Sequence, residues 1–311
     1  MIVPKIVFKG TIANHGRCAW TLGILILAAS VWAQPPKDLN RTPISDTDFA
    51  LVADHFAYDS SAPLDAVTIG SWPHRIPYIV EKVEFNSIHD QRVPAYFTHP
   101  VDSTQATHPA VLLLHGSNDF WGKNEDWALE WMDILSRQGW CVLVADAYGF
   151  GERKRAGQVL PSPQTPYAMR DAVIQSITDQ RRALDYLLTR PEIDPAKIAL
   201  LGGSMGGLAG VLVAGLEQRL AAVVLTVTGA FPGPMGTDHP LGKFIHTLNF
   251  APRITAPALM VNATEDRRAL GEELFNALPE PKKQIWYEGG HYLAPREYNE
   301  DILAWLHEQL N

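Results

Sequence analysis

The sequence contains almost no cysteine. Of its 311 residues only Cys18 and Cys141 are cysteines, and Cys18 lies in an N-terminal segment that we expect to be removed. The mature chain would then have a single thiol and no disulfide, which excludes a small disulfide-stabilised extracellular module. Because Cys141 begins the apolar run Cys141–Ala145, we expect it to be a buried structural thiol.

An excess of basic residues is also missing. The chain has 26 Lys and Arg against 34 Asp and Glu, a formal net charge of −8. Removal of residues 1–33 would take three positive charges and no acid, which changes the net charge to −11. A chain this acidic is a poor partner for nucleic acid or for an anionic membrane surface.

The N-terminal apolar stretch is short for a membrane span. It extends from Cys18 to Ala29, follows three basic residues, and is followed by the small residues of a cleavage site ending at Ala33. This pattern is typical of a secretory signal, so we predict a signal peptide over residues 1–33, cleavage after Ala33, and a periplasmic or secreted protein without stable membrane association. A retained N-terminal anchor is the alternative.

The rest of the chain shows no repeat and no low-complexity tract. Residues 34–77 are predicted to be an N-terminal extension and residues 78–311 one domain. Two alternating stretches, Tyr78–Ser87 and Arg92–Thr98, predict an antiparallel hairpin at a sheet edge. Buried-strand runs and helical patterns then alternate, which predicts an α/β fold with a mostly parallel, doubly wound sheet.

The predicted elements after the hairpin are strands at Ala110–Leu114, Trp140–Ala145, Ile198–Leu201, Ala221–Val227, Ala258–Val261 and Gln284–Tyr287, and helices at Asn124–Gln138, Ala168–Arg190, Leu208–Leu216, Ala269–Leu278 and Asn299–Leu310. Residues 229–253 are rich in glycine and proline and longer than an ordinary connection. They are a candidate lid, with a plain surface excursion as the alternative.

The strongest motif is a Gly-Gly-Ser-Met-Gly-Gly turn at 202–207, between an apolar run and a small-residue helical run. Strand, sharp turn and helix form the context in which Gly-x-Ser-x-Gly predicts a nucleophile elbow. Side chains at Gly202 or Gly206 would collide across so tight a turn, and the backbone of Ser204 would be strained. Ser204 is therefore the candidate nucleophile, and a glycine-rich turn in another doubly wound fold is the alternative.

A serine hydroxyl needs a base, and the base needs an acid to orient it. His291 follows two glycines directly after the last predicted strand and is the candidate base. Glu265 and Asp266 follow the strand at Ala258–Val261, and either carboxylate could orient the histidine. We favour Asp266, although it could instead cap the next helix.

The tetrahedral intermediate of such a reaction needs two amide N–H donors. The predicted donors are the N–H groups of Met205, after the nucleophile, and Ser117, after His115-Gly116. Phe120 and Trp121 follow closely and are predicted to wall the substrate pocket. No cluster has metal-ligand spacing and no phosphate-loop lysine follows the elbow, so neither a metal nor an organic cofactor is predicted.

Several stretches add to this pattern: Val93-Pro-Ala-Tyr-Phe, Pro109-Ala-Val-Leu-Leu-Leu-His-Gly116, Asp179-Gln-Arg-Arg-Ala-Leu-Asp-Tyr-Leu187, Arg190-Pro-Glu-Ile-Asp194 and Gly202-Gly-Ser-Met-Gly-Gly207. With the candidate triad they resemble the α/β-hydrolase superfamily, and within it the dienelactone-hydrolase-like and acetyl-xylan-esterase-like bacterial hydrolases. True dienelactone hydrolases carry a cysteine nucleophile, which Ser204 is not. The stretch at Asp179 is also similar to that of prolyl-oligopeptidase-type peptidases, whose large propeller domain a chain this short cannot hold.

We therefore expect a serine hydrolase that cleaves small-molecule carboxylic esters, with acetyl and other short acyl esters as candidate substrates. A peptidase or amidase using the same three side chains is the first alternative. An inactive binding protein on the same fold is the second. The sequence does not predict an oligomeric state.

Overall fold

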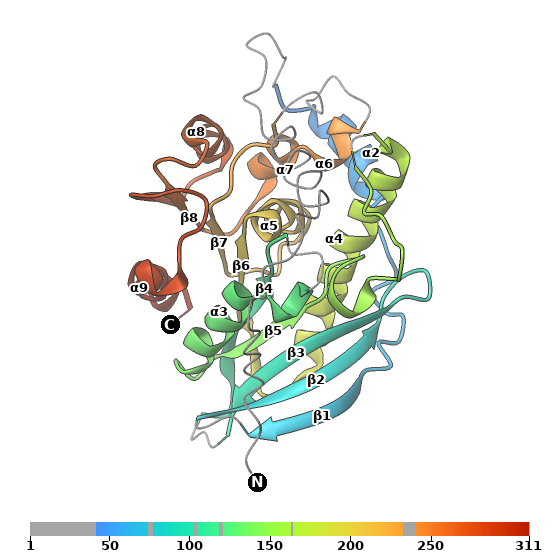
Figure 1. Cartoon of the computed structure of the whole chain (residues 1–311), viewed down its shortest axis with the longest axis vertical. Coiled ribbons are helices and arrows are strands. Elements are labelled where there is room, and N and C mark those ends of the chain that lie inside the picture. Colours follow the sequence, from blue (N-terminus) through green and yellow to red (C-terminus); the bar gives the residue numbers. More distant parts are fainter. Residues whose placement is uncertain are drawn as a thin grey trace, which may run out of the picture.

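The computed structural model describes residues 42–73, 77–101, 105–117, 121–162, 164–232 and 241–310. Within these residues the fold is one nine-stranded sheet with helices on both faces (Figure 1). The strand order is β1-β2-β3-β5-β4-β6-β7-β8-β9; the pairs from β1 to β5 are antiparallel and those from β5 to β9 are parallel. The predicted α/β class with a mostly parallel sheet is confirmed.

The strands are β1 (Val67–Pro73), β2 (Tyr78–Asn86), β3 (Arg92–Pro100), β4 (His108–Leu114), β5 (Cys141–Ala145), β6 (Ile193–Gly203), β7 (Ala222–Thr226), β8 (Ala258–Ala263) and β9 (Lys282–Tyr287). The helices are α2 (Asp46–Asp54), α3 (Asp126–Ser136), α4 (Pro166–Thr189), α5 (Met205–Leu216), α6 (Gly242–Ile245), α7 (Thr247–Phe250), α8 (Arg268–Ala277) and α9 (Asn299–Leu310), with short 3-10 turns at 122–124, 151–153, 251–253 and 295–297.

The central strands are buried on both faces. Successive residues along each strand pack alternately into two separate hydrophobic cores, one on each face of the sheet. Leu112 and Leu114 of β4 belong to the core shared with α4 and α5, whereas Val111 and Leu113 belong to the core shared with α3 and α9. A strand covered on both faces needs apolar residues at every position, which explains its unbroken hydrophobic run. The sheet is thus rigid where its parallel strands end, and those ends carry the loops discussed below.

The predicted N-terminal extension, residues 34–77, contains two regular elements. In its described part α2 packs Val52 into the core and β1 pairs with β2. The predicted β2–β3 hairpin exists, yet it is not the sheet edge, because β1 lies outside it (Figure 1). The pairing of β1 is interrupted by a register shift between Thr68 and Gly70, and none of the residues of this strand is buried. Its sequence therefore gives only a weak strand signal.

Two further predictions concern segments that are wholly or partly outside the described residues. The predicted signal peptide, residues 1–33, lies outside them, and so do residues 233–240 of the candidate lid. The described remainder of the lid packs inward: Phe231, Leu241 and Ile245 form a small buried cluster against α4 and α5. In the described part of the chain no helix is long and apolar enough to cross a membrane.

Candidate active site

The candidate nucleophile lies at the junction of β6 and α5. Ser204 has φ 54° and ψ −116°, a conformation that L-residues rarely adopt. Its backbone N–H donates to the Thr226 carbonyl of the neighbouring strand at 3.0 Å, and its own carbonyl accepts from Leu208 N–H at 3.0 Å. The strained residue is therefore fixed on both sides, with its hydroxyl at the N-terminus of α5.

The glycines of this turn are required by close backbone contacts. A Cβ on Gly202 would meet the Gly206 carbonyl, and a Cβ on Gly206 would meet the carbonyl oxygens of Leu114 and His115. On Gly207 it would meet the Thr228 hydroxyl. Backbone atoms cannot move aside as a flexible side chain can, so any larger residue at 202 or 206 would displace a strand end.

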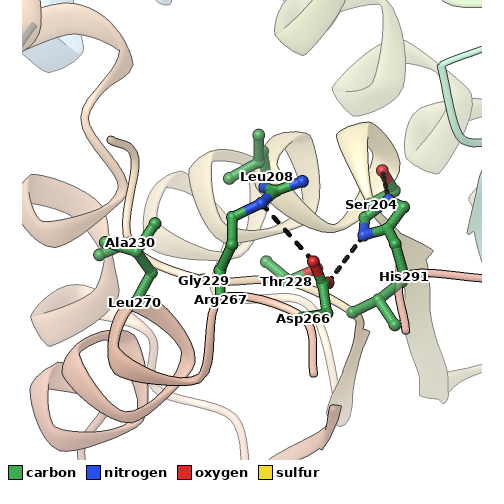
Figure 2. A pocket seen from close by; sticks show the side chains of 10 residues that line it. Ser204, Leu208, Thr228, Gly229, Ala230, Asp266, Arg267, Leu270 and His291 are labelled. Atoms are coloured by element: carbon green, nitrogen blue, oxygen red, sulfur yellow. Dashed lines mark hydrogen bonds and ion pairs between the residues drawn. The ribbon is translucent and has the colours of Figure 1, made fainter. Parts of the chain in front are cut away.

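Three side chains from separate loops meet at this edge of the sheet. The Ser204 Oγ lies 2.8 Å from His291 Nε2, and His291 Nδ1 lies 2.7 Å from Asp266 Oδ2. Figure 2 shows the imidazole between the hydroxyl and the carboxylate. Because the carboxylate faces Nδ1, it favours the proton on that nitrogen and leaves Nε2 free to accept the serine proton.

The structure distinguishes the two candidate acids. Asp266 is the one beside His291, while Glu265 is exposed and no contact joins it to the imidazole among the described residues. Asp266 does not cap the next helix: the N-cap position of α8 is Arg267, without a side-chain capping hydrogen bond. The arrangement of Ser204, His291 and Asp266 is thus the one that a serine hydrolase requires.

The two predicted N–H donors lie on different elements. Met205 is the first residue of α5, and Ser117 lies on the loop after β4. Directly before Ser117, the Gly116 N–H donates to Glu125 Oε2 at 2.6 Å, so this amide is already engaged. Burial raises the pKa of Glu125, the bond from Gly116 opposes the rise, and the nearby Asp126 adds to it.

A buried lysine holds the far end of the same loop. The side chain of Lys123 is fully buried; its Nζ lies 2.8 Å from Asp146 Oδ2 and 2.5 Å from Glu152 Oε1. Its backbone N–H also donates to Asp146 Oδ1 at 2.7 Å. Burial alone would raise the pKa of Glu152, but hydrogen bonds from Lys123 and Lys82 outweigh it and lower the pKa. The loop after β4 is thereby tied to the loop after β5.

His115 makes a second tie between these loops. Its Nε2 accepts from Ala147 N–H at 3.0 Å, which places the ring proton on Nδ1, 2.7 Å from the Gly116 carbonyl oxygen. Burial lowers the pKa of His115, which keeps the ring neutral in this tautomer. The neutral imidazole is held by two hydrogen bonds. It therefore fixes the start of the loop after β4, which carries the second predicted N–H donor.

Two cavities flank the nucleophile. The smaller, the triad pocket, has a volume of about 10 Å³ and is lined by Ser204, His291, Asp266, Arg267 and neighbouring residues (Figure 2). The Arg267 guanidinium lies 3.5 Å from Asp266 Oδ1, and burial lowers the pKa of Arg267 while Asp266 opposes the change. A cation of this kind steadies the carboxylate that orients His291.

The larger cavity, the α4–α5 chamber, has a volume of about 320 Å³. Its walls come from α4, α5, the loops after β4 and β5, and the described part of the lid segment. They are mostly apolar. The lining residues are Leu114, His115, Ser117, Ala147, Tyr148, Phe150, Leu160, Pro161, Met169, Ala172, Val173, Ser176, Ile177, Gln180, Met205, Gly206, Leu208, Ala209, Leu212, Phe231 and Ile245.

The two aromatic residues predicted to wall the substrate pocket do not help to define it. Phe120 lies outside the described residues, and Trp121 is 58% exposed and lines neither cavity. Sequence reasoning instead missed Lys123, Glu125 and Gln180. Nothing in their local sequence marks them, because each acquires its environment from segments far along the chain. In the described ranges no cluster of three His, Cys, Asp or Glu side chains could hold a metal ion.

The chain belongs to the alpha/beta hydrolase family, whose model matches residues 111–307, more than half of the chain. Among solved structures, an acetyl xylan esterase from Paenibacillus sp. R4 superposes with a TM-score of 0.69 at 18% identity, covering 91% of this chain and 99% of that one. A putative dienelactone hydrolase from Klebsiella pneumoniae gives a TM-score of 0.57 at 16% identity, covering 75% and 100%. The resemblance drawn from the motifs is confirmed at this level.

Curated relatives are matched over only part of their length. A putative hydrolase, YtaP, of Bacillus subtilis is 29% identical over 161 residues, 47% of this chain and 52% of YtaP. The acylamino-acid-releasing enzyme of Rattus norvegicus is 23% identical over 273 residues, 74% of this chain and 35% of that enzyme. The matches thus span about half and about a third of these two relatives.

Proposed function

We propose that this protein is a carboxylic ester hydrolase that works through an acyl-enzyme on Ser204. The observation that carries the proposal is the continuous series of hydrogen bonds from Ser204 through His291 to Asp266. The hydrolase family and the esterases among its structural neighbours support the reaction class.

In this proposal each group has one step. Ser204 Oγ attacks the ester carbonyl carbon while His291 Nε2 takes the hydroxyl proton. The carbonyl oxygen becomes an oxyanion and accepts hydrogen bonds from the N–H groups of Met205 and Ser117. The C–O bond then breaks, and His291 gives its proton to the departing alcohol oxygen. A water molecule then attacks the acyl-enzyme carbonyl while His291 takes its proton. The bond between Ser204 Oγ and the acyl group breaks, His291 returns the proton to Ser204, and the acid is released.

The first test is Ser204→Ala in the full chain with p-nitrophenyl acetate as substrate. We expect kcat/KM to fall on the order of 10⁴-fold or more, because the remaining groups cannot form the acyl-enzyme. A fluorophosphonate probe should label the wild-type protein and not the variant, with circular dichroism showing that both are folded. Retained turnover in Ser204→Ala would refute the nucleophile assignment, and unlabelled, inactive wild type would favour a binding protein.

Peptide or amide cleavage is the second candidate. It is favoured by the similarity to the acylamino-acid-releasing enzyme and by the stretch around Arg181 and Arg182. The same three side chains serve both reactions, so only the leaving group separates them. Comparing p-nitrophenyl acetate with an aminoacyl p-nitroanilide decides the matter: faster amide turnover would replace the ester proposal.

A further inference from the structure

The α4–α5 chamber is far larger than an acetyl group requires. Its volume of about 320 Å³ lies at the lower end of the range for sites that hold a whole small molecule. It adjoins the elbow directly, because Met205, Gly206 and Leu208 form part of its wall. The chamber therefore lies beside the candidate nucleophile and is large enough for a substrate group.

The positions of the reacting groups determine which half of an ester enters the chamber. Given the proposed function, the carbonyl oxygen lies at the N–H groups of Met205 and Ser117, both of which line the chamber. The leaving oxygen must face His291, which lines the triad pocket and not the chamber. The alcohol half thus lies on the side of His291, and the acyl half points into the chamber.

The chamber is long as well as large. Its α4 wall runs from Met169 to Gln180, which at the rise of a helix is about 16 Å. Met169 is partly exposed, whereas Ile177 and Gln180 are 1% and 2% exposed. The chamber is thus open near Met169 and closed at Gln180, and an acetyl group would leave most of its apolar wall uncovered.

The closed end is not wholly apolar. Gln180 lines the chamber, and its Oε1 has no hydrogen-bond partner among the described residues. A buried carbonyl oxygen without a donor is costly. Because this oxygen has almost no exposed area, a ligand hydroxyl at this end would supply the missing donor after a rotation of the Gln180 amide toward the chamber.

We propose that the acyl half of the substrate is an apolar group clearly larger than acetyl, seated in the α4–α5 chamber, with a hydroxyl at its far end that donates to Gln180. The apolar walls recognise the body of the group and the glutamine recognises its end. The proposal rests on the proposed ester hydrolysis, and it departs from the acetyl specificity that the names of structural neighbours suggest.

The first experiment is a series of p-nitrophenyl esters from acetate to octanoate on the wild-type protein. We expect kcat/KM for hexanoate or octanoate to exceed that for acetate at least tenfold, because added methylenes are buried in the chamber. A maximum at acetate with a steep decline by butanoate would overturn the inference. Since Ser204→Ala must abolish turnover of every ester in the series, that control separates failure of the inference from failure of the proposed function.

A matched pair of variants locates the acyl group. Ala172 lines the chamber, whereas Ala168 lies on the same helix, exposed and outside the chamber. Ala172→Phe should lower the octanoate-to-acetate ratio of kcat/KM at least tenfold, and Ala168→Phe should leave the ratio unchanged. Equal ratios in both variants would place the acyl group elsewhere. If Ala172→Phe does not fold, the ester series on the wild-type protein still tests the size of the acyl group.

The role of Gln180 is tested with p-nitrophenyl 3-phenylpropanoate and its 4-hydroxyphenyl analogue. We expect the wild-type protein to prefer the hydroxylated ester by about three- to tenfold, the worth of one hydrogen bond. Gln180→Leu should remove or reverse this preference in kcat/KM. Equal use of both esters by the wild type, or an unaltered preference in Gln180→Leu, would refute the hydroxyl at the far end.

Discussion

The two loops that border the Ser204 hydroxyl are held by opposite means. The elbow, residues 202–207, is held by backbone packed on backbone, possible only because Gly202 and Gly206 lack side chains. The described parts of the loop after β4, residues 115–117 and 121–125, are held by charged side chains: Lys123 reaches Asp146 and Glu152, and Glu125 accepts from Gly116 N–H. The elbow depends on the absence of side chains at its glycines, and the loop after β4 depends on charged side chains that pair with each other.

This difference separates two kinds of robustness. Steric packing does not change with pH, so the geometry of the elbow should persist wherever the protein is folded. A buried ion group is stable only while every charge keeps its partner, and losing one partner leaves the other uncompensated. The loop after β4 should therefore be the more vulnerable of the two, and the variants below test that comparison.

The largest expected effect is that of Lys123→Met. The substitution shortens the unbranched side chain by one atom and removes its charge, which leaves the fully buried Asp146 carboxylate without its cation. Breaking a buried pair from one side costs about 3–5 kcal/mol. Urea denaturation followed by circular dichroism should show a loss of this size in the free energy of unfolding.

Lys82→Met is the matched control. Lys82 also pairs with Glu152, at 2.6 Å, but its side chain is 24% exposed and Glu152 is 39% exposed. We expect a loss below about 1 kcal/mol, as for other exposed pairs. Equal losses in the two variants would mean that burial of Lys123 adds nothing, and two losses below about 1 kcal/mol would mean that charge does not hold the loop.

The next effect concerns the steric side of the comparison. Gly206→Ala should normally favour a helix, since alanine is the better helix former. Here the new Cβ would meet the Leu114 and His115 carbonyl oxygens, so we expect a net loss of about 1–3 kcal/mol. Thermal unfolding measures it, with Gly290→Ala as control.

A Cβ on Gly290 meets no atom within 4 Å, so Gly290→Ala should change the free energy of unfolding by less than about 0.5 kcal/mol. If Gly206→Ala were as stable as this control, the elbow would be able to accommodate a Cβ at this position despite the close backbone contacts. The comparison between the two loops would then fail on its steric side.

The same contrast explains what the sequence could predict. Ser204, Asp266 and His291 were identifiable because glycines and strand ends in the local sequence mark the turns that carry them. The alternation of apolar strands and amphipathic helices likewise predicted the sheet, since each strand of the core needs an unbroken apolar run. Local patterns encode local sterics.

Long-range partners were not predictable in this way. A lysine in a polar loop is normally solvated, and only the fold brings Lys123 to Asp146, 23 residues away. Gln180 is similar: a helical glutamine reveals nothing until the chamber around it is known. The exposed β1 was missed because its short alternation, Val67 and Ile69 against Thr68 and Gly70, ends at Ser71, and because none of its residues is buried.

The smallest expected effect is a change of pH dependence in Glu125→Gln. Burial raises the pKa of Glu125 from its ordinary 4.5, so the folded protein holds this proton more tightly than the unfolded chain. The stability that this group contributes is present below about pH 4.5 and is lost as the pH rises through the raised pKa. Glutamine keeps an acceptor for Gly116 N–H but cannot ionise. The free energy of unfolding of Glu125→Gln, relative to wild type, should therefore increase from pH 4 to pH 7 in urea titrations. A relative stability that falls over this range would show that the carboxylate charge stabilises the loop after β4 by more than its burial costs. This loop would then be more robust than its comparison with the elbow implies.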